Sequence, residues 1–429
     1  MNGTLAGGDQ QEVICLLVLV QFVLGASLYF NFLSHGVMPK AATHLGGEHR
    51  CIAQSLAAGR GFADPFGIPT GQTAWMAPVF PALLAVLFKF LDGIEAVASV
   101  VLLLQDLVLI YMGLLVLRFA SGPGHAQRDR TLALVLYLAA LACHYRYMFI
   151  YTHDHVIVLF WICLFMDLSD RLYARLPSVV AAVGWGVAGG LATLTSPVLG
   201  PVWAGLTVTL AASAGRVRRF AVSGLIAAAV VTPWTVRNAL VFHRLIPVKS
   251  NLPFELYQSQ CLEPDGVLRE ATALTHPYVS DGEEHARYKQ LGEMKYLDEK
   301  GRAFLESVRG NPLSFCKRVF NRLLAASVLH IPYESRNGSV SQMLGRIIFP
   351  LPVVGMVLML ASPGWAKDRR KVIALVIFVM HLTPYILVSY YVRYAIPLLP
   401  IKVLFCFWGL ESATRAVWPP GRLPHLREP

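Results

Sequence analysis

The sequence predicts an all-α polytopic membrane protein with about ten transmembrane helices. Of its 429 residues, 55% are hydrophobic and only 15% are charged, a balance that leaves too few polar side chains to cover a soluble protein. Apolar runs of roughly 15 to 22 residues recur along the chain, near the length that a helix needs to cross a hydrocarbon core of about 30 Å. Basic residues fall mainly between these runs, which is typical of polytopic membrane proteins.

The first apolar run, residues 13–33, is predicted to be a retained span. It has no basic segment before it and no evident cleavage site after it, so it does not look like a signal peptide. The other predicted spans share an apolar composition and a near absence of charge. They lie at about 96–117, 131–150, 156–170, 178–194, 198–214, 220–236, 345–362, 372–390 and 394–412.

Basic clusters between the spans predict the side on which each loop lies. They comprise Arg118, Arg128 and Arg130; Arg171 and Arg175; Arg216, Arg218 and Arg219; and residues 367–371. Short loops rich in Lys and Arg stay in the cytoplasm, so we expect all of these clusters on that side. The apolar segment 77–93 then cannot be a span, because it would invert the sides after it. It is predicted to lie in the membrane interface, with both ends of the chain facing the cytoplasm.

Three segments are then predicted to lie outside the cytoplasm. The first outer loop, about 34–95, should hold two interfacial helices, at 47–58 and 78–91. A short loop follows at 151–155, and the long polar stretch 237–344 carries a charged helical pattern and then an amphipathic one. The expected division is a transmembrane module at 1–236, an outer region at 237–344, and C-terminal helices with a short cytoplasmic tail at 345–429.

The formal net charge of +11 does not indicate nucleic-acid binding. No basic stripe with interleaved aromatic side chains stands in a soluble domain, so membrane lipids and not nucleic acid are the expected surroundings. The seven cysteines show no metal-binding spacing. Cys51, Cys261 and Cys316 would face outside, and a disulfide among them stays an open alternative.

Two carboxylates are expected at the outer edge of the membrane, Glu48 and Asp154. Placing an acid at the membrane edge costs free energy, so such an acid suggests a functional role. A pair of carboxylates could supply a general base together with an orienting or metal-binding group. Alternatively, both could be solvated loop residues.

Basic side chains are expected on the same face. Arg237 and Asn238 end one predicted span, Arg393 and Tyr394 begin the last one, and Arg146 lies near the outer end of another. Outer arginines at span boundaries are unusual under the positive-inside rule. They could form a phosphate clamp, because a guanidinium pairs with phosphate oxygens bidentately. The alternative is that they reach the lipid headgroups without a specific role.

Histidines flank both acids. His49 follows Glu48, and His153 and His155 enclose Asp154 in an H-D-H pattern. Alternate histidines in a short loop are a weak indication of a metal, so a divalent ion stays an open alternative and no cofactor is assigned. The sequence contains no P-loop, no G-x-G-x-x-G and no G-x-S-x-G motif, which argues against a cytosolic nucleotide-sugar domain.

Three stretches carry a family resemblance. Glu48 is followed by IAQSLAAGRGF (52–62) and PVFPALLA (78–85), and then come TPWTVRNALVFHRLIPVKSN (232–251) and YYVRYAIPLLP (390–400). In this order and on this side, they resemble the GT-C superfamily of polyprenyl-phosphate-dependent membrane glycosyltransferases. The nearest patterns are those of bacterial relatives of protein O-mannosyltransferases and of the lipid A aminoarabinose transferase. The resemblance covers most of the chain up to about 251 and the last span.

The resemblance implies a polyprenyl-phosphate sugar donor and transfer with inversion outside the cytoplasm, in a bacterial inner membrane. Glu48 matches the first-loop acid that takes the proton from the acceptor hydroxyl, and Asp154 matches the second-loop acid. Arg237 and Arg393 match basic positions that could contact the lipid phosphate. Relatives commonly have aspartate where this chain has Glu48. The acceptor, whether protein, lipid or glycan, is left open, and its recognition is expected from residues 251–344.

Two other readings remain open. A transporter or lipid flippase would need ionisable groups or broken helices at the bilayer midplane, and Asp106, beside Gln105, is the main candidate for such a group. A polar contact between helices is the commoner fate of such residues. The third reading is a GT-C-like scaffold without catalysis, because of the glutamate at position 48.

Overall fold

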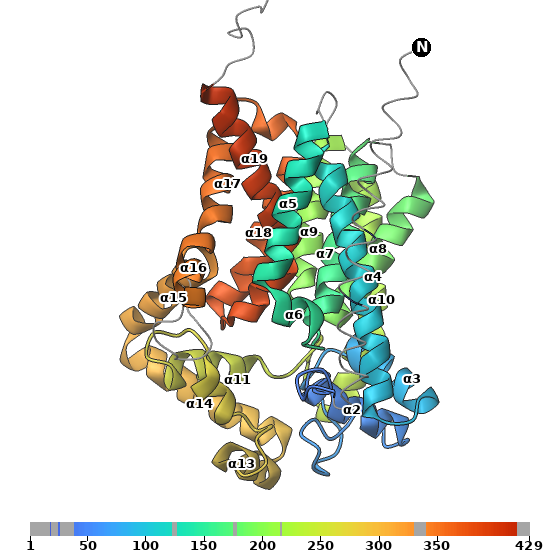
Figure 1. Cartoon of the computed structure of the whole chain (residues 1–429). Helices are drawn as coiled ribbons and strands as arrows, with labels where there is room; N and C mark the ends of the chain where they lie inside the picture. The colour runs from blue at the N-terminus through green and yellow to red at the C-terminus, as the bar shows by residue number, and fades with distance from the viewer. Residues whose placement is uncertain are drawn as a thin grey trace, which may run out of the picture.

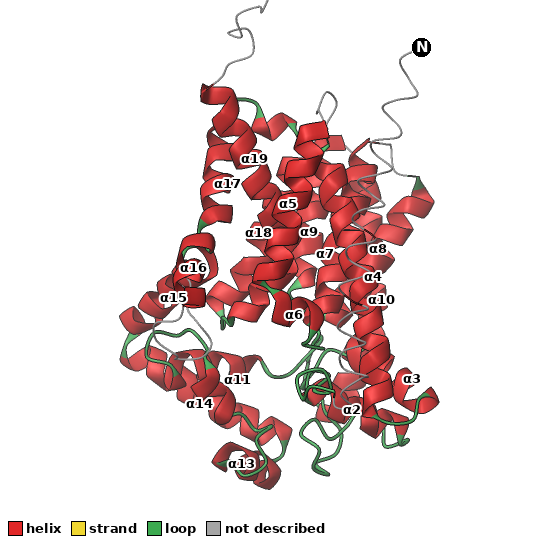
Figure 2. Cartoon of the chain, viewed as in Figure 1, coloured by secondary structure: helices red, strands yellow, loops and turns green. Residues whose placement is uncertain are grey.

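The computed structural model describes residues 38–121, 127–174, 178–214, 217–329 and 340–417, with the isolated positions 18 and 25. Within these ranges the fold is all-helical, as predicted, and the β contacts are two isolated bridges, Ala63–Gln72 and Val267–Tyr390 (Figure 2). The predicted span 13–33 lies outside the described residues except for positions 18 and 25. Arg175 and Arg216 lie outside them too.

Long apolar helices pack side by side into a bundle (Figure 1). These are α4 (Ile94–Ala120), α5 (Gln127–Cys143), α7 (His155–Ala174), α8 (Val179–Thr195), α9 (Leu199–Ala214), α10 (Val217–Phe242), α17 (Leu351–Ala361), α18 (Arg369–Leu387) and α19 (Leu399–Val417). Buried side chains such as Met112, Phe165 and Phe405 form their common core. Among the described residues, four segments are long and apolar enough to cross a membrane: 94–120, 217–242, 369–387 and 392–417. The count of about ten spans stays a prediction.

Three predicted spans are interrupted in the structure. The span at 131–150 divides at His144, where α5 ends and the short α6 (Tyr145–Phe149) begins. The span at 345–362 divides into α16 (Val340–Ile348) and α17, with Pro350 at the N-cap of α17. The last span begins as the 3₁₀ helix η3 (Val392–Leu398), which contains Pro397, and continues as α19. Proline lacks the amide hydrogen that a continuous helix needs, so the last two breaks follow from the sequence.

The helices of the first outer loop and of the stretch 237–344 gather at one end of the bundle, in the lower part of Figure 1. They are α2 (Glu48–Ala57), α3 (Val79–Phe90), α11 (Leu252–Tyr257), α12 (Glu270–Leu274), α13 (Glu283–Leu291), α14 (Glu293–Gly310) and α15 (Pro312–Ser327). The two helices predicted for the first outer loop are confirmed as α2 and α3. At 12 residues, α3 would be about 18 Å long, too short to cross the hydrocarbon core. We call this end of the molecule the outer layer.

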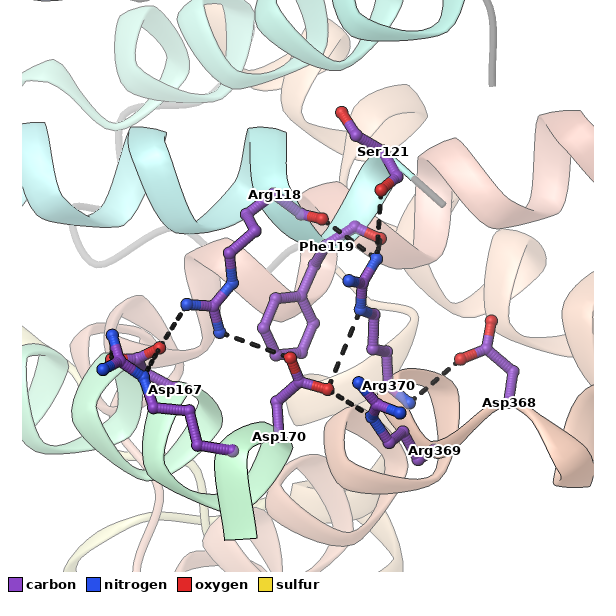
Figure 3. Close-up of polar contacts among 9 residues, drawn as sticks. Arg118, Phe119, Ser121, Asp167, Asp170, Asp368, Arg369 and Arg370 are labelled. Carbon is purple, nitrogen blue, oxygen red and sulfur yellow. Dashed lines mark hydrogen bonds and ion pairs between the residues drawn. The ribbon is translucent and has the colours of Figure 1, made fainter. Parts of the chain in front are cut away.

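The opposite end of the bundle carries an ion-pair network (Figure 3). Arg118 at the end of α4 pairs with Asp167 and Asp170 of α7, and Arg369 at the start of α18 pairs with Asp170 at 2.6 Å. Arg370 donates to backbone carbonyls at the end of α4. Both aspartates are buried, so each carboxylate needs its arginine partners. Three of the basic clusters thus lie on the end remote from the outer layer.

A buried carboxylate fastens the first outer loop to the outer region. Glu293, at the start of α14, accepts hydrogen bonds from the Thr73 hydroxyl, from the Ala74 amide at 3.0 Å and from the Ser250 hydroxyl at 2.6 Å. The Tyr288 hydroxyl donates a fourth at 3.1 Å. An aromatic cluster of Phe66, Trp75, Phe254, Tyr288 and Tyr296 packs beside it. Segments more than 200 residues apart are therefore held together where they form the walls of a cavity.

Replacement of Glu293 by alanine should destabilise the outer layer. It leaves the buried Thr73 and Ser250 hydroxyls and the Ala74 amide without their acceptor, and we expect a loss of about 3–5 kcal/mol in the free energy of unfolding. Thermal unfolding in detergent measures it. The control is Glu299→Ala, because Glu299 pairs at the surface with Arg287 and should contribute at most about 1 kcal/mol. Equal losses in the two variants would contradict the role of Glu293.

Candidate functional site

A cavity of about 830 Å³ lies between the outer layer and the adjoining end of the bundle. Its walls come from the start of α2, the loop before α7, the turn between α8 and α9, and segments 247–258, 273–278 and 384–394. Ligand pockets in proteins typically measure about 300–1,000 Å³. The cavity is therefore large enough for a small ligand with several functional groups.

Most of the predicted site residues meet in this cavity. Its lining includes both acids, Glu48 and Asp154, and also His49, His153, Arg393 and Tyr394. Glu48 lies more than 100 residues from Asp154, and Asp154 lies more than 230 residues from Arg393. The fold thus brings together side chains that the predicted topology placed on one face of the membrane. Arg237, Asn238, Arg146 and His155 do not line it.

Backbone geometry sets the position of Glu48 at the first residue of α2. Leu45, Gly46 and Gly47 all have positive φ, at 49°, 73° and 51°, which turns the chain sharply into the helix. A Cβ atom on Gly47 would lie 3.0 Å from side-chain atoms of His44 and Tyr278. Glycine is required there because it alone combines this backbone with such close approach. The turn delivers the Glu48 side chain to the cavity.

Arg237 and Asn238 make hydrogen bonds within the protein and do not line the cavity. The Arg237 guanidinium donates to the Thr73 carbonyl at 2.7 Å and the Phe62 carbonyl at 3.2 Å, and it lies 4.9 Å from the Trp234 ring. Asn238 is fully buried, where it accepts from Arg237 and donates to the Ile246 carbonyl. These contacts attach the first outer loop to the end of α10.

Arg146 and His155 are also turned to local partners. Arg146 is exposed on α6 and donates to the Tyr151 hydroxyl at 3.2 Å. His155 is buried at the start of α7, and its Nε2 donates to the Tyr147 carbonyl at 2.7 Å. His155 therefore does not point its Nε2 toward His153 or Asp154, and the H-D-H pattern does not act as a unit.

The described residues form neither a cluster of metal ligands nor a disulfide. In the described part of the chain, no three His, Cys, Asp or Glu side chains are close enough to hold a metal ion. Cys51, Cys261 and Cys316 are all free thiols, so the alternative of a disulfide among them is wrong for this structure.

The cationic side chains of Lys40, Lys249 and Arg393, which line the cavity, make no hydrogen bond or ion pair with a described residue. Arg393 makes no hydrogen bond or ion pair with any described residue, although its guanidinium lies 5.2 Å and 5.5 Å from the rings of Tyr391 and Tyr394. Lys249 also lines the cavity without such a partner in the described ranges. Lys249 lies within the motif at 232–251, but the sequence did not predict it as a site residue. A cation without a protein partner in a cavity is available to an anionic ligand.

The charge of Asp154 is matched to these cations. Burial raises the pKa of its carboxyl, but the nearby positive charges of His49 and Arg393 outweigh burial and hold the pKa below its ordinary value. Asp154 therefore stays ionised at neutral pH. It can orient a cation or accept a hydrogen bond from a ligand hydroxyl.

Glu48 has a histidine partner that the sequence did not reveal. His276 lies in the outer region with its Nε2 3.5 Å from Oε1 of Glu48. The Tyr278 amide donates to Nδ1 of His276 at 3.2 Å, so the ring proton is on Nε2 and faces Glu48. Rings of Phe66 and Phe254 enclose the imidazole. His276 is thus a rigid neutral donor beside the carboxylate, and no motif pointed to it.

Buried histidines should make the protein sensitive to acid. Burial lowers the pKa of His44, His153 and His276 below the ordinary value of 6.5. Below pH 6.5 these histidines therefore bind more protons in the unfolded chain than in the folded one. The free energy of unfolding then decreases as the pH falls from about 6.5 toward the folded pKa values. We expect the unfolding midpoint to drop between pH 7 and pH 5. His276→Gln should flatten this dependence, whereas an exposed-site control, His243→Gln, should not.

Comparison with known proteins shows the fold. No family model and no curated protein matches the chain. Among solved structures it is similar to the archaeal oligosaccharyltransferase AglB from Archaeoglobus fulgidus in complex with an inhibitory peptide and a dolichol-phosphate, with TM-score 0.51 and 13% identity over 95% of this chain. The apo form of an oligosaccharyltransferase from the same organism gives TM-score 0.49 and 14% identity over 95% of this chain. The chain spans about half of each, 50% and 51%.

The likeness to AglB, at 13% identity, shows a shared fold and does not extend to the bacterial relatives named above. Together with the four apolar candidate spans, it indicates an integral membrane protein.

Proposed function

We propose that this chain is a membrane glycosyltransferase that moves a sugar from a polyprenyl-phosphate donor to an acceptor hydroxyl outside the cytoplasm, with inversion. One observation carries the proposal: a single cavity is lined by three carboxylates, Glu48, Asp154 and Glu255, and by three cations, Lys40, Lys249 and Arg393, whose side chains make no hydrogen bond or ion pair with a described residue. Acids and free cations together suit a ligand that carries both a phosphate and a group that must lose a proton. The AglB structure contains a dolichol-phosphate, which is consistent with a lipid-phosphate ligand.

Arg393 and Lys249 would hold the donor phosphate. The guanidinium of Arg393 can pair with two phosphate oxygens, and Lys249 adds a second positive charge from another wall of the cavity. Their charges also stabilise the leaving group, because negative charge grows on the polyprenyl phosphate as its bond to the sugar breaks.

Glu48 would act as the general base. Its carboxylate takes the proton from the acceptor hydroxyl, and the hydroxyl oxygen attacks the anomeric carbon from the face opposite the phosphate. The bond between the anomeric carbon and the phosphate oxygen breaks, polyprenyl phosphate leaves, and the configuration inverts. His276 acts as a positioning residue by directing its Nε2 hydrogen at Glu48. Asp154 would orient the acceptor and balance Arg393. The bacterial inner membrane is the proposed location.

Cysteine labelling tests the shared outer face of the two acids. Glu48→Cys and Asp154→Cys are made singly in a cysteine-free background and labelled in intact cells with an impermeant thiol reagent. Both should react from outside, and an added polyprenyl phosphate should protect both. Tyr173→Cys, near the end of α7 that is remote from the outer layer, is the control and should react only after permeabilisation. Reaction of the two acid positions from opposite sides would overturn the proposed site.

A further inference from the structure

We infer that Asn251, Glu255 and Gln258 bind the hydroxyl groups of the transferred sugar. The inference rests on the proposed function and names the surface that would select the donor. Asn251 is the N-cap of α11, and α11 passes directly into the π-helix η1 (Gln258–Leu262). Intervals of four and three residues put the three side chains on one side of this helical segment, and all three line the cavity. We call them the 251–258 face.

The 251–258 face has hydrogen-bonding groups without protein partners. Asn251 is 2% exposed and Gln258 is 3% exposed. The Oδ1 atom of Asn251 is buried without a partner, and the Gln258 amide makes no hydrogen bond with a described residue. A buried polar group without a partner costs about 1–3 kcal/mol, so this face is suited to a ligand that supplies the missing partners.

Glu255 completes the face as an acceptor. It accepts from the Asn251 amide at 3.3 Å and from the Ser389 hydroxyl at 2.8 Å, which fixes its orientation and leaves lone pairs for a ligand. The face therefore offers amide donors, amide acceptors and carboxylate acceptors within one helical turn or two. A ring with several hydroxyl groups, each both donor and acceptor, is the ligand that matches this set.

The position of the face agrees with that of a transferred sugar. On one side, Ser389 binds Glu255, and Arg393 follows four residues later in the same cavity wall. On the other side, the His276 ring lies 5.1 Å from that of Phe254, and its Nε2 approaches Glu48. Through these contacts α11 is joined to the wall that carries Arg393 and to His276 beside Glu48, so the face borders the cavity that both share. An inverting displacement needs the sugar there, because its anomeric carbon lies between the leaving phosphate and the attacking oxygen.

Binding of short lipid phosphates with and without a sugar tests the inference. The probes are farnesyl phosphate and farnesyl phosphates that carry mannose, glucose or arabinose, measured by calorimetry on the full chain in nanodiscs. The wild type should bind at least one sugar-bearing probe more tightly than farnesyl phosphate. Gln258→Leu and Glu255→Gln should weaken that probe about tenfold or more and leave farnesyl phosphate within about twofold.

Lys249→Met is the matched control, because loss of a phosphate contact should weaken all probes alike. Retained farnesyl phosphate binding shows that a variant is folded, and Gln258→Leu is the decisive variant since the Gln258 side chain has no hydrogen bond with a described residue to lose. The inference is overturned if Gln258→Leu and Glu255→Gln leave sugar binding unchanged or weaken all probes equally. It is also overturned if no sugar improves wild-type binding. Failure of the wild type to bind farnesyl phosphate at all would instead overturn the proposed function.

Discussion

Replacement of Glu48 by glutamine should lower kcat by about 10²- to 10⁴-fold and leave the affinity for the donor nearly unchanged. The amide keeps the size and hydrogen-bonding capacity of the side chain at the start of α2, but it cannot accept the proton of the acceptor hydroxyl. Because Arg393 and Lys249, the proposed phosphate-binding residues, lie on other walls of the cavity, donor binding should not need the negative charge of Glu48.

Single-turnover transfer from a radiolabelled polyprenyl-phosphate sugar, at saturating donor, measures this effect. Glu95→Gln is the control, since Glu95 is an exposed glutamate in the first turn of α4 and does not line the cavity. Glu48→Asp should retain more activity than Glu48→Gln, because aspartate keeps the charge at a shorter reach. If Glu48→Gln lost donor binding but kept its turnover at saturating donor, Glu48 would be a binding residue and not the base.

Replacement of Arg393 by methionine should weaken binding of the donor about tenfold or more. A charge-assisted contact between arginine and phosphate contributes about 1.5–3 kcal/mol, and 1.4 kcal/mol corresponds to a factor of ten in affinity. The loss of stability should be smaller than in Arg237→Met, because the Arg393 guanidinium has no hydrogen bond with a described residue and gives up only its ring contacts and its charge near Asp154. Calorimetric titration with farnesyl phosphate gives the affinity, and thermal unfolding gives the stability.

Arg237→Met should change the same two quantities, the affinity for farnesyl phosphate and the thermal stability, in the opposite way to Arg393→Met. It removes the hydrogen bonds to the Phe62 and Thr73 carbonyls, so the unfolding temperature should fall while the folded protein still binds farnesyl phosphate. The two arginines therefore separate a ligand-binding role from a structural one. Weakened binding with normal stability in Arg237→Met, together with normal binding in Arg393→Met, would reverse the assignment.

The outer-layer helices and the meeting of the two acids were predictable because their signals are local. The amphipathic run after Glu48 and the apolar run after Pro78 each specify a helix from adjacent residues, and α2 and α3 are found within two residues of the predicted limits. Charge between the apolar runs predicted that Glu48 and Asp154 share a face, and both line one cavity. By contrast, the break at His144 interrupts an apolar pattern that carries no proline, so periodicity predicted one helix there.

The identity of several site residues depended on packing between distant segments. His276 and Gln258 lie in the outer region, where the sequence offers helical patterns but no motif; they line the cavity in the fold in which Glu293 joins this region to the first outer loop. Lys249 lies in a motif, but nothing in the motif distinguishes a cation that faces a cavity from one that faces water. Their roles follow from neighbours that are remote in sequence.

The sequence by itself determined that this chain is helical and membrane-embedded, because transfer of apolar side chains from water to lipid is a property of each segment. Only the tertiary structure decided which arginine is available to a ligand. Arg237 and Arg393 both stand at a span boundary beside aromatic residues, yet Arg237 donates to carbonyls 164 and 175 residues away, and Arg393 donates to none in the described part of the chain. A guanidinium that is already hydrogen-bonded cannot hold a phosphate without breaking those bonds, and only the packed chain shows which bonds exist.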